Sequence, residues 1–243
     1  MTNFKNKVAL VTGASSGIGA AIAEQLSNQG VRVFGAQRTP SNYEDILSDL
    51  SDPKAPEEII SVIKKVTGRL DILINNAGIM TEGTVEETTL KNWNRHLSIN
   101  LTAPFLLIRE AMPLLREFRG SIVNLGSVEG IGNNPRHPAY GASKSGLHGL
   151  TRAVAVDHGK DGVRCNAVAP GWIDTPLNEN FVKGMDDPIG FREKLSDIHP
   201  IGRSGQPSEV AELICWLVSD AASFVTGQVW TIDGGRMTKL SLP

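Results

Sequence analysis

The chain has 243 residues, of which 40% are hydrophobic and 21% are charged, a composition typical of a globular protein that can bury one large core. Its formal net charge is −2 and its lysines and arginines are scattered, so we expect neither nucleic acid nor an anionic membrane surface as a partner. Its two cysteines, Cys165 and Cys215, form no CxxC pair, and no histidine spacing predicts a metal site.

The N-terminal residues run directly into an apolar, strand-like segment. They lack the apolar core and the small-residue cleavage site of a secretory signal peptide. No stretch of the chain approaches the ~18 consecutive apolar residues of a membrane span. We therefore expect a cytoplasmic protein that does not insert into a membrane.

Short apolar segments rich in valine and isoleucine alternate with longer amphipathic ones along the chain. The predicted strands are residues 7–11, 31–36, 70–74, 120–125, 162–168 and 228–232. Because these strands are continuously apolar, helices should cover both faces of their sheet. The sequence therefore predicts an α/β fold, a doubly wound, Rossmann-like parallel sheet in three α/β/α layers. No linker divides the chain, so we expect residues 1–243 to form a single domain.

A glycine-rich turn follows the first predicted strand. The sequence from Thr12 to Gly19, TGASSGIG, leads into a helix that is expected to end near Gly30. Glycines let the backbone approach a ligand closely, and the free N–H groups of a helix N-terminus attract anions. This context predicts a site for a dinucleotide pyrophosphate, formed by Gly13, Ser15, Ser16, Gly17, Ile18 and Gly19.

The connection after the second strand is unusually short. Only residues 39–44 separate Arg38 from a third strand expected around Asp45 to Asp49, whereas parallel strands usually need a crossover of a dozen or more residues. A helix does not fit there. Either the crossover is a bare loop or the third strand is short and poorly formed, and in both cases this edge of the sheet should be less covered than usual.

Three polar residues suggest catalysis. Tyr140 and Lys144 are four residues apart in a helical run of small residues, 139–157, so their side chains share one helix face. An adjacent ammonium group is expected to lower the tyrosine pKa, which lets the phenol exchange a proton with an alcohol or carbonyl oxygen. Ser127 ends the strand before this helix, where its hydroxyl can orient that oxygen. Taken singly, each has another explanation: Tyr140 as a core aromatic, Lys144 as a solvated surface charge and Ser127 as a helix or turn cap.

These motifs together resemble the short-chain dehydrogenase/reductase family over nearly the whole chain. The resemblance rests on TGASSGIG, on Asn75-Asn76-Ala77-Gly78 after a strand, and on the Ser-x12-Tyr-x3-Lys spacing. It implies an NAD(P)-dependent oxidoreductase that transfers a hydride between a nicotinamide and a carbonyl or secondary alcohol. It also implies a homotetramer, because the helix with Tyr140 and Lys144 commonly lies at a subunit interface in this family.

The resemblance assigns further residues. Asn100 matches a fourth catalytic position that holds a water linking the lysine to solvent, although alone it also suits a helix kink or cap before Pro104. The positions expected to contact the cofactor are Asp49 and Leu50 beside the adenine, Asn76 at the adenine ribose with Ala77 and Gly78 of the same motif, and Pro170, Gly171, Ile173 and Thr175 beside the nicotinamide and phosphate, together with Tyr140 and Lys144.

The choice between NAD(H) and NADP(H) should depend on the end of the second strand. A carboxylate there bonds the ribose 2′-hydroxyl of NAD, whereas an arginine pairs with the 2′-phosphate of NADP. Gln37 stands where an acid would indicate NAD, and Arg38 follows it. NADP(H) is therefore favoured and NAD(H) remains possible, with a solvated loop cation as the alternative role for Arg38.

Two segments, residues 129–138 and residues 176–205, are expected to line the substrate site. In the first, Asn133, Asn134, Arg136 and His137 suit a hydroxylated or anionic substrate, but exposed loop residues are the favoured interpretation. The second mixes helical turns with glycine and proline and is a candidate lid. Neither predicts a pocket for a steroid or a long acyl chain, so a small polar carbonyl or alcohol is favoured. A regulatory protein that binds a dinucleotide without turnover is the alternative function.

Overall fold

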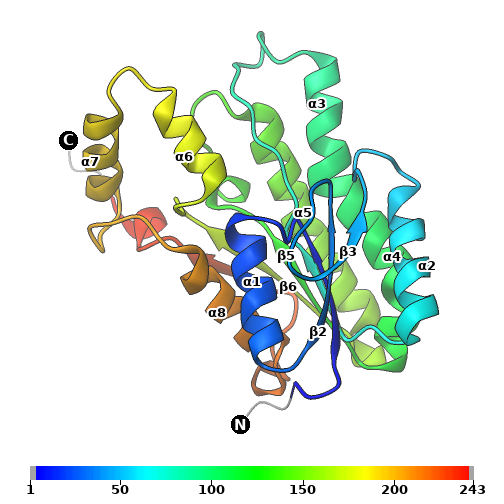
Figure 1. The fold of residues 1–243 in the computed structure, drawn as a ribbon. Helices are drawn as coiled ribbons and strands as arrows, with labels where there is room; N and C mark the ends of the chain where they lie inside the picture. The colour runs from blue at the N-terminus through cyan, green and yellow to red at the C-terminus, as the bar shows by residue number, and fades with distance from the viewer. Residues whose placement is uncertain (1–3, 241–243) are drawn as a thin grey trace.

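Seven parallel strands form one sheet in the computed structural model, which describes residues 4–240 (Figure 1). Their order across the sheet is β3-β2-β1-β4-β5-β6-β7. The strands are β1 (Val8–Thr12), β2 (Arg32–Gln37), β3 (Glu44–Leu47), β4 (Ile72–Asn75), β5 (Ser121–Leu125), β6 (Arg164–Pro170) and β7 (Val229–Ile232). Helices cover both faces in a single domain, so the predicted doubly wound, three-layer fold is confirmed.

The helices divide between the two faces of the sheet. One face carries α1 (Gly17–Asn28) and α8 (Pro207–Val218), and the other carries α2 (Ala55–Thr67), α4 (Ala103–Glu117) and α5 (Pro138–His158). The π-helical turn η1 (Ser98–Thr102) joins α3 (Leu90–Leu97) to α4. Two further helices, α6 (Pro176–Lys183) and α7 (Pro188–Ile198), stand beyond the edge of the sheet (Figure 1, yellow).

Short helical turns lie in the connections. The 3-10 turns are η2 (Val128–Gly130), η3 (Gly159–Asp161), η4 (Asp220–Ala222) and η5 (Arg236–Thr238). No helix within residues 4–240 is both long and apolar enough to cross a bilayer.

The apolar strands explain why two separate cores form. Side chains of β1 alternate between the faces, so Val11 packs with Ile22 of α1, while Leu10 packs with Ile59 of α2. All four side chains are fully buried, and each such burial contributes about 1.5–3 kcal/mol relative to exposure. The sheet is thus clamped between two helix layers, which gives the loops at its carboxyl edge a rigid support.

The short crossover after β2 is a bare loop, as one of the two alternatives predicted. Residues 38–43 contain no helix, and β3 pairs in parallel with β2 from Phe34↔Glu44 to Gln37↔Leu47. β3 is also short, and Leu47 on it is 60% exposed. The expectation of a poorly covered sheet edge is therefore confirmed.

The order of the strands reverses between β1 and β4. β1 pairs with β2 on one side and with β4 on the other, so the loops that follow β1 and β4 diverge at this point. Open α/β sheets bind their ligands in the crevice that forms here, outside the carboxyl ends of the strands. The turns after Thr12, Asn75, Leu125 and Pro170 all lie at this edge.

Candidate active site

A cleft of about 520 Å³, here called the central cleft, opens at the carboxyl edge of the sheet. Nearly all the residues predicted from the sequence line it, namely Gly13, Ser15, Ser16, Gly17, Ile18, Arg38, Asp49, Leu50, Asn76, Ala77, Gly78, Ser127, Tyr140, Lys144, Pro170, Gly171, Ile173 and Thr175. Gly19 and Asn100 do not line it. The fold thus brings residues that are far apart in the sequence to one cavity.

The glycine turn has the backbone that its sequence requires. Gly13 and Gly17 have φ of 70° and 56°, in the left-handed region that side-chain-bearing residues rarely adopt. A Cβ on Gly19 would overlap Gly13 O and Asn76 Nδ2. Gly19 is therefore needed for the approach of α1 to this turn and not for contact with the cleft. The N-terminus of α1 is left facing the cavity, as an anion site requires.

Thr12 ties the glycine turn to the NNAG turn after β4, a role that sequence reasoning missed. Its hydroxyl accepts hydrogen bonds from the backbone N–H groups of Asn76, at 2.9 Å, and Ala77, at 3.0 Å. The amide of Asn76 donates in return to the Thr12 carbonyl at 2.8 Å. Thr12 ends β1 one residue before the glycines, and this position was its only sequence signal. These bonds fix the spacing of two walls of the central cleft.

A carboxylate from β3 lies beside the end of β2, a contact that the sequence did not predict. Gln37 Oε1 accepts from the N–H of Ala14 at 3.2 Å, and its Nε2 donates to Asp45 Oδ1 of β3 at 2.5 Å. The Gln37 amide is therefore occupied on both sides. Arg38 is exposed and lines the cleft, and Asp49, beyond β3, lies across from it. The short crossover is what brings Asp45 beside Gln37.

Ser127, Tyr140 and Lys144 meet at the inner end of the cleft. Lys144 Nζ lies 5.6 Å from the centre of the Tyr140 ring, so the two side chains share one face of α5 as predicted. Lys144 is buried, and its Nζ donates to the Leu125 carbonyl at 2.6 Å. Ser127 lies two residues beyond β5, as the N-cap of η2, and not within the strand. Its Oγ accepts from the N–H of Glu129 at 3.1 Å.

The protein groups alone do not lower the pKa of Tyr140, contrary to expectation. Burial raises the pKa of Tyr140 to about 12, and this effect outweighs the hydrogen bond with Ser127, which acts to lower it. Burial also lowers the pKa of Lys144 to about 8. The lysine is thus a weaker source of positive charge than an exposed ammonium, because desolvation penalises the charged form of both groups.

Asn100 lies behind the cleft, in η1. Its Nδ2 donates to Ile79 O at 2.9 Å and to Ser143 Oγ at 3.0 Å, and its Oδ1 accepts from Ile79 N at 2.9 Å. A Cβ on Gly78 would lie 3.4 Å from Asn100 Oδ1 and 3.6 Å from Lys144 Nζ. Asn100 therefore ties the NNAG turn to α5, and it does so from a π-helical turn, a feature frequent at functional sites.

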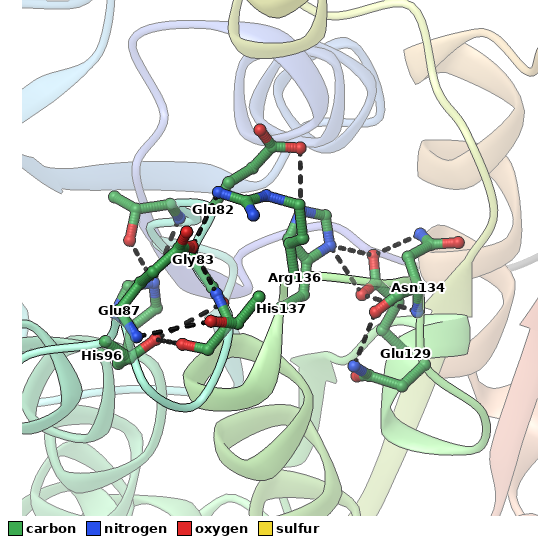
Figure 2. Close-up of polar contacts among 12 residues, drawn as sticks. Glu82, Gly83, Glu87, His96, Glu129, Asn134, Arg136 and His137 are labelled. Carbon is green, nitrogen blue, oxygen red and sulfur yellow. Dashed lines mark hydrogen bonds and ion pairs between the residues drawn. The ribbon is translucent and has the colours of Figure 1, made fainter.

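The loop between Ser127 and Tyr140 differs from the expectation of exposed residues. Arg136 and Asn133 are exposed, but His137 is only 6% exposed and Glu129 only 7%. These two form a buried ion pair, with His137 Nδ1 2.9 Å from Glu129 Oε2 (Figure 2). Sequence reasoning missed the pair because neither residue type nor their spacing indicates burial in a loop rich in glycine, asparagine and proline.

The candidate lid consists of α6 and α7. Leu177, Asn178 and Asn180 of α6 line the central cleft, so this helix closes one side of it. Trp172 packs against Phe181 at 5.8 Å and Phe191 at 5.5 Å between ring centroids. This aromatic cluster joins α6 and α7 to the turn after β6, an apolar anchor that the sequence did not indicate.

Comparisons with known proteins agree with this geometry. The family model described as enoyl-(acyl carrier protein) reductase matches residues 13–237. A 3-oxoacyl-(acyl-carrier-protein) reductase of Thermotoga maritima is 35% identical, over 96% of this chain and 98% of its own. The chain belongs to the short-chain dehydrogenase/reductase family. It is, accordingly, an NAD(P)-dependent oxidoreductase that acts on small molecules.

Two other members of the family illustrate its range. The meso-2,3-butanediol dehydrogenase of Serratia marcescens is 34% identical, over 96% of this chain and 95% of its own. The solved structure of the aldohexose dehydrogenase of Thermoplasma acidophilum superposes with a TM-score of 0.94 at 34% identity, covering 100% of this chain and 99% of that one. These relatives differ in the substrates they are named for, so the substrate of this member is a separate question.

Proposed function

We propose that this dehydrogenase/reductase catalyses reversible hydride transfer between NADP(H) and the carbonyl or secondary alcohol of a small polar substrate. The observation that carries the proposal is the meeting of Ser127, Tyr140 and Lys144 at the inner end of a cleft whose outer walls suit a dinucleotide. The left-handed Gly13 and Gly17 leave a cradle that side chains would obstruct, which supports a fit for the pyrophosphate.

Each catalytic side chain has a distinct role in this proposal. Ser127 is hydrogen-bonded to Glu129 N and to Tyr140, which places its hydroxyl beside the phenol, where both groups can bond the substrate oxygen. Tyr140 gives a proton to that oxygen in reduction and takes it in oxidation. Lys144 holds the nicotinamide ribose and, with Asn100, connects Tyr140 to a proton path.

When bound, the cofactor would supply the hydride, and its oxidised form would add a positive charge to the cleft. This charge is needed because burial leaves the pKa of Tyr140 at about 12. Tyr140 is therefore expected to become an effective base only in the complex with oxidised cofactor.

The preference for NADP(H) rests on Arg38. It is exposed and lines the cleft at the end of β2, where it can pair with a 2′-phosphate. Gln37 is less available to the ribose, since Oε1 and Nε2 of its amide each already have a partner within the protein. Asp45 acts against this preference, because its carboxylate lies behind Gln37 and repels a phosphate.

Arg38→Ala tests the cofactor assignment. The variant should bind NADPH about tenfold or more weakly and leave NADH binding nearly unchanged, because only the phosphate needs the guanidinium. Lys64→Ala, at an exposed position on α2 away from the cleft, is the matched control. Fluorescence titration with both cofactors measures the affinities. Equal losses for NADH and NADPH would contradict the assignment.

The substrate class rests on the walls of the inner cleft. Ser127, Asn178 and Asn180 place polar side chains along the cleft, beside the apolar side chains of Ile79, Met80 and Leu177. The aromatic cluster of Trp172 lies outside the lining and supports α6, which we propose as a lid over the substrate.

A screen of substrates with both cofactors tests the reaction itself. We expect turnover, followed by the absorbance of the reduced nicotinamide, with polyols, sugars, diketones or hydroxy ketones and little with steroids or long acyl chains. Tight NADPH binding without turnover on any carbonyl or alcohol of a broad panel would instead favour a dinucleotide-binding regulatory protein.

A further inference from the structure

The Glu129–His137 pair lies next to the catalytic residues without lining the central cleft. Both oxygens of Glu129 are bonded, Oε2 to His137 Nδ1 at 2.9 Å and Oε1 to Asn134 Nδ2 at 2.8 Å (Figure 2). A carboxylate and an imidazole are rarely buried together unless each has its partner. The burial of these two polar side chains therefore requires a structural or functional explanation.

The pair closes the loop that separates the two catalytic residues. At one end, Glu129 N donates to Ser127 Oγ at 3.1 Å. At the other end, the His137 ring lies edge-on to Tyr140, 6.3 Å between centroids and at 74° between planes. Glu129 and His137 are eight residues apart, and their hydrogen bond joins the two ends of the loop. This hydrogen bond therefore ties the residue next to Ser127 to the ring next to Tyr140.

The pair also places charge beside the Tyr140 phenol. The Glu129 carboxylate acts to raise the pKa of Tyr140. The hydrogen bond between His137 and Glu129 raises the pKa of His137, although burial acts to lower it. The hydrogen bond thus favours the imidazolium form. The Glu129 carboxylate, held by its hydrogen bond with His137, is therefore within electrostatic reach of the Tyr140 phenol.

Other charged groups around the pair are themselves partnered. Glu82 Oε1 lies 3.7 Å from His137 Nε2, too far for a hydrogen bond but close enough to favour the imidazolium. Arg136 pairs with Glu87 at 2.8 Å on the outer side. Asn134 accepts from Arg236 of the C-terminal segment at 2.6 Å. On α5, Lys144 is the cation nearest to Tyr140.

We propose that Glu129 and His137 are positioning residues, a buried hydrogen-bonded pair that holds Ser127 against Tyr140 and fixes the Glu129 carboxylate near the phenol. The inference rests on the proposed function, because it matters for catalysis only if Tyr140 is the acid and base. Neither residue touches the cleft, so neither contacts the substrate or cofactor.

Three variants separate the charge of the pair from its hydrogen bond. Glu129→Gln removes the anion, His137→Asn removes the cation but keeps a donor near the place of Nδ1, and the double variant makes a neutral hydrogen-bonded pair. Relative to the wild type, Tyr140 should ionise about one pH unit lower in E129Q and in the double variant, because both lack the carboxylate. H137N keeps the carboxylate and replaces an imidazole that is already neutral where Tyr140 titrates, so its Tyr140 should titrate near the wild-type pH.

The ionisation of Tyr140 can be followed without any substrate. The chain has two tyrosines, so Tyr43→Phe leaves Tyr140 as the single one, and carbon-13 labelling of the tyrosine ring reports its titration. Circular dichroism at each pH confirms that the compared proteins are folded. If H137N does not fold, E129Q and the double variant still test the predicted shift against the wild type. Titration of Tyr140 at the wild-type pH in E129Q and the double variant would overturn the proposal.

Turnover supplies a second readout. E129Q and H137N should lower kcat about tenfold and leave the Kd for NADPH unchanged, and E129Q should also shift the alkaline limb of the kcat/KM profile to lower pH. The double variant should recover much of kcat. A fall in stability with an unmoved pH profile would show a merely structural pair and contradict the inference. A wild type that binds cofactor but turns over nothing refutes the proposed function alone, because the Tyr140 titration still tests the pair.

Discussion

At Tyr140, burial and charge act in opposite directions on the proton that the reaction needs. Burial raises the pKa of Tyr140 to about 12, while the hydrogen bond with Ser127 acts to lower it. Lys144, also buried, has its pKa lowered to about 8 and is anchored to the Leu125 carbonyl. The protein therefore holds the phenol protonated, which suits a group that donates its proton during carbonyl reduction.

Removing the Tyr140 hydroxyl should abolish the chemistry and spare the fold. We expect Tyr140→Phe to lower kcat by about 10²–10⁴-fold, the range for loss of a general acid or base, because the ring remains and its proton is lost. The affinity for NADPH should change little. Single-turnover kinetics and cofactor titration measure both. The same substitution at Tyr43, which lies outside the cleft, is the control, and turnover by Y140F near the wild-type rate would refute the assignment.

His148 gives a prediction about acid stability. It is 4% exposed and fills the space where a Cβ on Gly126 or Gly130 would lie. Burial, then the Lys144 charge, lowers the pKa of His148 to about 4. The unfolded chain takes up this proton near pH 6.5 and the folded one only near pH 4, so stability falls as the pH is lowered through this interval.

Substituting His148 should remove that part of the pH dependence. With allowance for solvent screening, the loss between about pH 7 and pH 4 is up to about 2 kcal/mol, and His148→Gln should not show it. Urea unfolding at several pH values measures the effect. His158→Gln, at the partly exposed end of the same helix, should keep the wild-type dependence. Parallel profiles for wild type and H148Q would contradict this explanation.

At the scale of elements, the junction of β1, its turn and α1 depends on Gly19. A methyl group there would overlap Gly13 O and Asn76 Nδ2, so the turn must shift away from its cradle shape. Gly19→Ala should therefore weaken NADPH binding about tenfold or more, which is about 1.4 kcal/mol. Gly159→Ala is the control, because Gly159 has φ of −58° and open space around its Cα. Unchanged affinity in G19A would show that the turn tolerates the shift.

The lid depends on the aromatic cluster between α6 and α7. Trp172→Ala removes the ring that packs on both Phe181 and Phe191, so the two helices should close less firmly over the substrate. We expect KM for the substrate to rise about five- to tenfold and proteolysis between the two helices to accelerate. Phe224→Ala, at a fully exposed ring, is the control. Equal KM and cleavage rates in wild type and W172A would argue against a lid.

At the scale of the whole molecule, we propose a homotetramer that uses the outer face of α5. Val156 on this helix is 80% exposed, and Phe105 on α4, on the same face of the sheet, is 47% exposed. Large apolar side chains that helices leave exposed suit an interface between subunits. Light scattering after gel filtration should give four times the mass of the chain.

A charge on α5 should disrupt that assembly. Val156→Glu is expected to yield dimers or monomers, because an uncompensated carboxylate would be buried at the interface. Val85→Glu, at a valine that is 75% exposed in a connection, should leave the assembly intact. A tetramer that survives V156E, or a wild-type monomer, would place the interface elsewhere or remove it.

Much of the fold and of the candidate site could be predicted from local sequence. Apolar strands, helix periodicity and the glycine turn predict the sheet and the pyrophosphate cradle, because each depends on residues close together in the chain. The spacing of Tyr140 and Lys144 is a property of a single helix, so their neighbourhood was predictable as well. Even the short crossover before β3 was readable, since chain length alone excludes a helix there.

Only the tertiary structure decided the charges around the site. The raised pKa of Tyr140, the burial of Glu129 with His137 and the place of Asp45 beside Gln37 all depend on how separate segments pack. Desolvation and Coulomb interactions are set by three-dimensional distance and not by sequence spacing. The sequence therefore determined which residues meet at the catalytic edge, and the packed fold determined the protonation states they have there.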